Sequence, residues 1–225
     1  MEIRNDCAHL PKSALRHVQR GLSWIHPADL VGVGVIRLID KTPIDLMLYL
    51  KERRAAAPTQ TALAFYLKAE KNTPARIVVI VPRVIREIPR WMMWTPAPTL
   101  LFARVLAHEV GHHLIERRGY ALHPTERPVR RLDEYEEEMV DRYAFEVLRR
   151  MRRSFRYKLG QRLIDELAGW RNAQGRAAWE CGAYAESRDL FLSAFRLKPD
   201  VADYAKCYRA AQVKVEKESG LTAKR

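Results

Sequence analysis

Hydrophobic and polar positions follow two different spacings in the N-terminal part of the chain. A helical spacing covers residues 13–22 and 43–54, which predicts two short helices. Runs rich in β-branched residues predict strands over 30–39, 61–69, 76–81 and 84–88. This part of the chain is therefore expected to combine helices with a small sheet.

The spacing becomes helical throughout the rest of the chain. One long helix is predicted from Thr99, a suitable N-cap, to a stop at Gly119. A second long helix is predicted over about 133–153, with acidic residues in its first turns and arginines at its end. The fold class that we expect is α+β, with a mixed domain over 1–155 and an all-helical region over 156–225.

The first long helix contains the sequence His108-Glu109-Val110-Gly111-His112. Residues four apart lie on one helix face, so both imidazoles can reach a single metal ion, and neutral imidazole suits zinc. Glu109 is rotated by about 100° from His108, which puts its carboxylate beside the metal, where it can act as a general base. The alternative is a pair of buried core histidines, which would be costly without an ion or another partner.

A catalytic zinc site needs a third protein ligand. The buried stripe of the second long helix is predicted to consist of Val140, Ala144, Val147, Leu148 and Met151. Glu137 lies about 35° from the centre of this stripe, so its carboxylate faces the interior. Asp141, one turn on, is expected to accept a proton from a ligand histidine. The residues that compete with Glu137 for the third position are Asp133, Glu136 and His123.

The pattern His108-Glu109-x-x-His112 followed by Glu137-x-x-x-Asp141 resembles the gluzincin metallopeptidases, which include thermolysin-like, HtpX-like and ImmA/IrrE-like families. The resemblance implies a zincin-like domain, in which a short mixed sheet accompanies the HExxH helix and the glutamate helix. It also implies that His108, His112 and Glu137 hold Zn²⁺. Glu109 is then the general base, and Asp141 orients a ligand histidine.

This resemblance covers roughly residues 60–150 and predicts a zinc-dependent enzyme that hydrolyses peptide bonds in a peptide or protein substrate. Such a reaction needs an oxyanion donor, for which the candidates are Tyr135, Tyr143 and His123. The stretch 83–94, rich in tryptophan and methionine, is expected to form either a substrate-binding sheet edge or ordinary core.

Charge suggests a second function. The chain has 40 lysines and arginines against 27 acidic residues, a net charge of +13. The run 149–158 interleaves basic and aromatic residues, as in phosphate-binding surfaces, although a solvated helix face has the same composition. The alternative to a peptidase is therefore a non-catalytic, metal-binding regulatory or scaffold protein associated with nucleic acid. The intact Glu109 favours the peptidase.

The C-terminal region resembles one tetratricopeptide repeat in the spacing of Gly175, Gly182, Tyr184, Phe191, Ala194 and Pro199. One repeat cannot bury its own core, so this region is expected either to cap the core or to hold a protein partner.

No apolar run approaches the ~20 residues of a membrane span. The chain also lacks a basic N-terminal segment followed by an apolar one. A cytoplasmic protein with no membrane partner is the expectation that follows.

Overall fold

The computed structural model describes residues 1–8, 12–41, 62–71, 73–117 and 130–218. The helix predicted over 43–54 lies outside these residues. The chain divides into two compact units, Met1–Tyr157 and Lys158–Arg225, where the sequence analysis predicted a boundary after residue 155. A four-stranded sheet and several helices make up the described chain, so the α+β class is confirmed.

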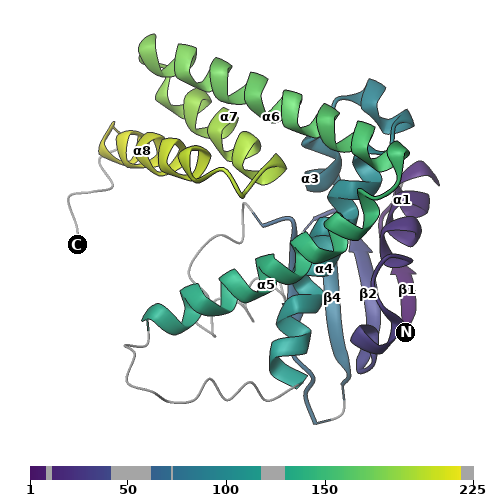
Figure 1. Ribbon diagram of the computed structural model, residues 1–225. Helices are drawn as coiled ribbons and strands as arrows, with labels where there is room; N and C mark the ends of the chain where they lie inside the picture. The colour runs from purple at the N-terminus through teal and green to yellow at the C-terminus, as the bar shows by residue number, and fades with distance from the viewer. Residues whose placement is uncertain (9–11, 42–61, 72, 118–129, 219–225) are drawn as a thin grey trace. The chain divides into compact units, whose positions relative to one another are not determined.

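The sheet of the first unit has the strand order β1-β2-β4-β3 (Figure 1). Its strands are β1 (Glu2–Asn5), β2 (Val33–Ile39), β3 (Ala64–Leu67) and β4 (Ala75–Ile80). β1, β2 and β4 are parallel, whereas β3 runs antiparallel to β4 at one edge. The continuous apolar run of β4 is explained by its central position, because a central strand is covered on both faces.

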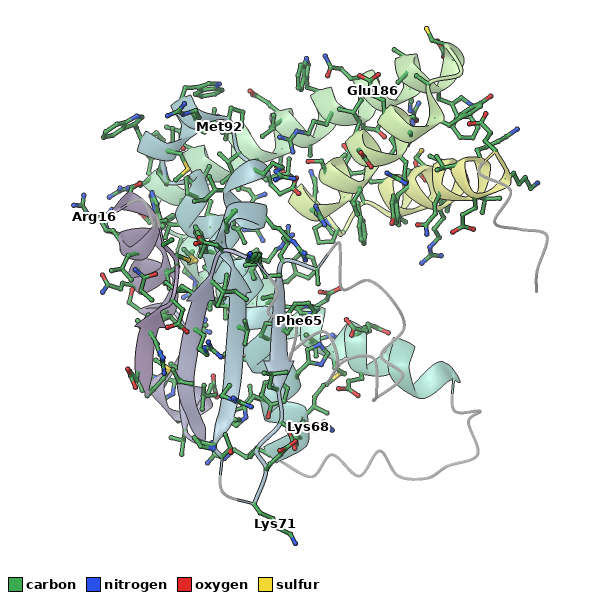
Figure 2. All side chains as sticks on the ribbon, turned by 180° about the vertical axis from the view of Figure 1, so that it is seen from behind. Arg16, Phe65, Lys68, Lys71, Met92 and Glu186 are labelled. Carbon is green, nitrogen blue, oxygen red and sulfur yellow. The ribbon has the colours of Figure 1, made fainter. Side chains whose placement is uncertain are left out.

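The antiparallel edge strand is short and is anchored to the core. Phe65 packs from β3 against a buried cluster of Ile39, Leu67, Val78 and Ile80. Figure 2 labels Phe65, together with Lys68 just after the strand and Lys71 in the turn towards β4.

Two strand predictions need correction. The run 84–88 is not a strand, because its first residues belong to α3 (Val81–Arg86), which begins at Val81 and has Pro82 in its first turn. Proline lacks the N–H that a sheet ladder needs and has the backbone angle of a first helical turn. The stretch 83–94 is therefore no sheet edge, and its second half forms the 3₁₀ helix η2 (Arg90–Trp94).

The strand predicted over 30–39 starts later, and one strand was missed. β2 begins at Val33, because Leu30 ends the 3₁₀ helix η1 (Pro27–Leu30) and Gly32 has a φ of 97°. β1 was not predicted because it is a mostly exposed edge strand of only four residues, too short and polar for a pattern.

Helix α4 (Ala97–Arg117) is the central helix of this unit and contacts α1 (Lys12–Leu22), β3 and β4 (Figure 1). It begins before Thr99, so the predicted N-cap is wrong. Thr99 is buried inside the first turns, where its Oγ1 lies 2.7 Å from Nδ1 of His17 on α1. The hydroxyl satisfies a buried histidine instead of a helix terminus.

Helix α5 (Arg130–Met151) packs along α4. All five residues of its predicted stripe are buried: Val140, Ala144, Val147, Leu148 and Met151. The helical wheel was sufficient to predict the buried residues of α5, because a helix packed on one side has one apolar face.

The second unit contains no strand among its described residues. Most of α6 (Phe155–Glu180) belongs to it, with α7 (Tyr184–Leu197) and α8 (Ala202–Glu218). A Cβ on Gly175 would lie 2.7 Å from the Phe191 ring, and the Ser187 hydroxyl donates to the Gly175 carbonyl. Glycine thus allows α6 and α7 to pack closely. That this tetratricopeptide-like region binds a protein partner stays a prediction.

Candidate metal centre

Two histidines of α4 lie side by side on the face of the helix that meets α5. The rings of His108 and His112 have centroids 5.1 Å apart and are nearly perpendicular, at 82°. Their side chains are 29% and 20% exposed, so they are accessible to an ion without being on the open surface. This is the arrangement that the i, i+4 spacing predicts.

The carboxylate of Glu137 on α5 faces both rings, but its side chain is 56% exposed, so the prediction that it faces the interior was wrong. Its Oε2 lies 3.5 Å from Nε2 of His108, and its Oε1 lies 3.5 Å from Nε2 of His112. The ligand atoms of these three residues all lie within 4.8 Å of one another. Two elements therefore bring two imidazole nitrogens and one carboxylate to one point.

The other nitrogen of each ring is held by a second carboxylate. Nδ1 of His108 lies 3.0 Å from Oδ1 of Asp141, and Nδ1 of His112 lies 3.2 Å from Oε1 of Glu136. Each carboxylate can only accept, so Nδ1 carries a proton, and in the neutral ring the lone pair is then on Nε2, directed towards Glu137. Glu136, expected as a rival ligand, instead orients a histidine.

A signal for Glu136 was present in the sequence. The two helices run in opposite directions where they meet: His108 contacts Asp141, and the later His112 contacts the earlier Glu136. A partner for His112 must therefore lie about one turn before Asp141. Glu136 and Glu137 are both there, and a helical wheel of one helix alone cannot assign their separate roles.

Glu109 lies beside the histidines but is almost completely buried, with 8% of its surface exposed. Burial raises the pKa of this carboxyl, and the charge of Glu137 raises it further. The two histidines and a hydrogen bond from the Tyr66 backbone N–H lower the pKa only in part. Glu109 therefore holds a proton more readily than a solvent-exposed glutamate does.

The pKa of His108 is also shifted. Burial alone would lower it, but the hydrogen bond to Asp141 and the charges of Glu109 and Glu137 raise it above its ordinary value. Without an ion, the carboxylates around His108 thus favour its protonated form, and a divalent cation would supply the positive charge in its place.

The neighbouring His113 has a structural role. Its Nε2 lies 2.9 Å from the Val31 carbonyl oxygen, and its Nδ1 lies 3.1 Å from the hydroxyl of Tyr66. That hydroxyl donates to Glu116 at 2.5 Å, and burial together with Glu116 raises the pKa of Tyr66. A Cβ on Gly32 would lie 3.2 Å from the His113 ring, so glycine is needed there. Sequence reasoning missed Tyr66 because a single tyrosine in a strand has no distinguishing pattern.

The other predicted residues are not brought to this centre by the described structure. The hydroxyl of Tyr143 donates to Oδ2 of Asp29 at 2.7 Å. His123 and the side chains of Asp133 and Tyr135 lie outside the described residues. The oxyanion donor therefore remains a prediction with three candidates.

In comparisons with known proteins, no family model, no curated protein and no solved structure matches this chain.

Among the described residues, no helix has both the length and the apolar character that a bilayer crossing demands.

Proposed function

We propose that the chain is a zinc-dependent peptidase with a zincin-like catalytic domain. The observation that carries the proposal is the orientation of the two histidines. Both Nε2 atoms point to Glu137 at 3.5 Å, while Asp141 and Glu136 occupy the Nδ1 atoms. Carboxylates behind the ligand imidazoles are the usual supporting groups of zinc sites.

The distances suit an ion better than direct ion pairs. A charge-assisted hydrogen bond between imidazole and carboxylate is about 2.7–2.9 Å long, and both contacts to Glu137 are 3.5 Å. Ligands about 2.0–2.1 Å from a tetrahedral zinc ion are about 3.4 Å apart. Two imidazoles and one carboxylate are also the donor set of many catalytic zinc sites, in which a fourth position stays open.

The residues of the centre would then have different roles in hydrolysis. Bound zinc would polarise a peptide carbonyl and lower the pKa of a water molecule towards about 7. Glu109 would take the proton from this water and deliver it to the leaving amine. Its buried carboxyl, with a raised pKa, suits a group that must hold that proton between the two steps.

The sheet edge next to α4 supports a peptide substrate. In the described part of the chain, β3 pairs with β4 alone. The Ile80 N–H donates to the Leu63 carbonyl, so alternate residues Ala64 and Tyr66 direct their backbone groups away from β4. The Tyr66 N–H already reaches Glu109, so an extended peptide along this edge would pair with the Tyr66 carbonyl and the Ala64 backbone groups, and it would lie beside the proposed base.

The test is peptide cleavage by the zinc-loaded chain, with E109Q and E138Q compared with the parent. Glu138 lies on α5 but is exposed and forms an ion pair with Arg142, so E138Q is the matched control. We expect E109Q to retain zinc, measured by elemental analysis, and to lose a factor of about 10² or more in the rate of cleavage of a quenched fluorescent peptide library. E138Q should cleave at the parental rate.

Two outcomes would contradict the proposal. Cleavage by E109Q at the parental rate would exclude Glu109 as the base. A parent that binds zinc but cleaves neither the library nor casein would instead favour a non-catalytic metal-binding role.

A further inference from the structure

A second candidate site lies where α5 ends. A cavity of about 420 Å³ opens between the residues that follow α1 and the end of α5. Its lining residues are Ser23, Trp24, Ile25, His26, Pro27, Arg150, Arg153 and Ser154. Arg150 lies 13 residues after Glu137, which is about 20 Å along a helix, so this cavity is separate from the metal centre.

The lining is basic. Arg150 and Arg153 contribute two guanidinium groups, and the described lining contains no carboxylate. The Nε atom of Arg150 is buried and has no hydrogen-bond partner among the described residues. Because this Nε is closed to solvent, any contact between Arg150 and a ligand in the cavity would come from the other nitrogens of its guanidinium group.

The remaining lining residues suit the same kind of ligand. The Nδ1 atom of His26 accepts a hydrogen bond from the Ala28 N–H, so in the neutral ring Nε2 carries the proton and is a donor. Ser154 adds a hydroxyl at the exposed rim. Trp24, held by edge-to-face packing at 5.6 Å on Tyr157, adds an aromatic wall.

We propose that this cavity binds the phosphate group of a small phosphorylated molecule. Guanidinium groups match phosphate oxygens in geometry and charge. The volume lies within the range of small-molecule sites and exceeds what a single anion fills. The basic and aromatic run 149–158 thus contributes Arg150 and Arg153 to a defined site, instead of forming only a solvated surface.

The experiment is calorimetric titration of the full chain with inorganic phosphate and with adenosine monophosphate, at low salt and with and without zinc. We expect binding without zinc, weakened about tenfold or more in R153Q and in R150Q, as loss of a charged hydrogen bond implies. Stronger binding of the nucleotide would support the aromatic wall as the base-binding part, and equal binding would support a site for phosphate alone.

The matched control is R149Q, which removes the same charge from an exposed residue paired with Glu146 outside the cavity. R149Q should bind with the parental affinity. Equal weakening of binding in R149Q and R153Q would overturn the proposal, because the net positive charge would then explain the attraction. Binding that requires zinc, or no binding to the parent, would overturn it as well. If R150Q does not fold, R153Q still provides the test because Arg153 is exposed.

Discussion

Gly111 and Val140 face each other where α4 and α5 meet at the candidate metal centre. A Cβ built on Gly111 would lie 3.0 Å from both Cα and Cγ1 of Val140. The absence of a side chain at Gly111 therefore allows the glutamate helix to approach the two histidines closely. The glycine inside the HExxH sequence has a packing role that the motif itself does not require.

We predict that G111A moves α5 away by a few tenths of an ångström and weakens zinc binding. Overpacking in a close helix contact costs about 1–3 kcal/mol, which outweighs the gain of up to about 1 kcal/mol in helix propensity. Zinc affinity by competition with a chromogenic chelator and the midpoint of thermal unfolding measure the two effects.

The control for G111A is G169A. Gly169 lies inside α6, and a Cβ there would meet nothing within 4 Å. This substitution should leave zinc affinity unchanged and raise the unfolding midpoint slightly. Parental zinc affinity in G111A would mean that the helix approach does not set the geometry of the centre.

The three proposed ligands should each be necessary for stoichiometric zinc. H112A and E137A remove a donor from a set of three, so we expect zinc content to fall from about one ion per chain to well below a half after dialysis. Elemental analysis of the purified chain measures this. E138A should keep its zinc, and an unaltered zinc content in E137A would assign the third position to another residue.

The two supporting carboxylates should affect affinity more than chemistry. D141N and E136Q keep the shape of each side chain but remove its charge, so we expect zinc to bind about 10–100-fold more weakly. At saturating zinc, peptide cleavage should recover to within a few-fold of the parent. A loss of cleavage that saturating zinc does not restore would give Asp141 or Glu136 a direct part in the reaction.

The metal-free chain should lose stability as pH rises. Folding raises the pKa of Glu109 from 4.5 and that of His108 from 6.5. Between each of these values and the higher pKa of the same group in the folded chain, the folded state binds more protons than the unfolded state. Unfolding then releases protons, and its free energy falls with rising pH. The stabilisation that zinc provides should instead grow with rising pH, because zinc must displace the proton that the carboxylates hold on His108.

Thermal unfolding of the chelator-treated and zinc-loaded chain between about pH 5 and 8 measures both trends. The gain in midpoint from zinc should grow with pH. Comparison with E109Q separates the contribution of Glu109 from the general effect of net charge. A metal-free midpoint that falls as steeply with pH in E109Q as in the parent would contradict the assignment to Glu109.

The sequence was informative where one local pattern decides the structure. The spacing of His108 and His112 and the apolar stripe of α5 depend on helix geometry alone, so both could be predicted. Thr99 and the run 84–88 were misassigned because tertiary context decided them: a buried His17 bonds the hydroxyl of Thr99, and Pro82 starts a helix. Relations between two elements, such as Glu136 with His112, need the packing of α4 on α5: the spacing from Asp141 narrows the partner of His112 to Glu136 or Glu137, but neither helix alone assigns their roles.

Tyr66 joins the edge strand β3 to α4 at two points. Its hydroxyl bonds His113 and Glu116, while its backbone N–H reaches Glu109. The strand therefore cannot slide along α4 without breaking these bonds, which sets the position of the sheet edge relative to Glu109. For a peptidase built in this way, Tyr66 would set the cleavage position. Every extended chain docked on β3 would be cut at the same number of residues from the point where it pairs with the strand.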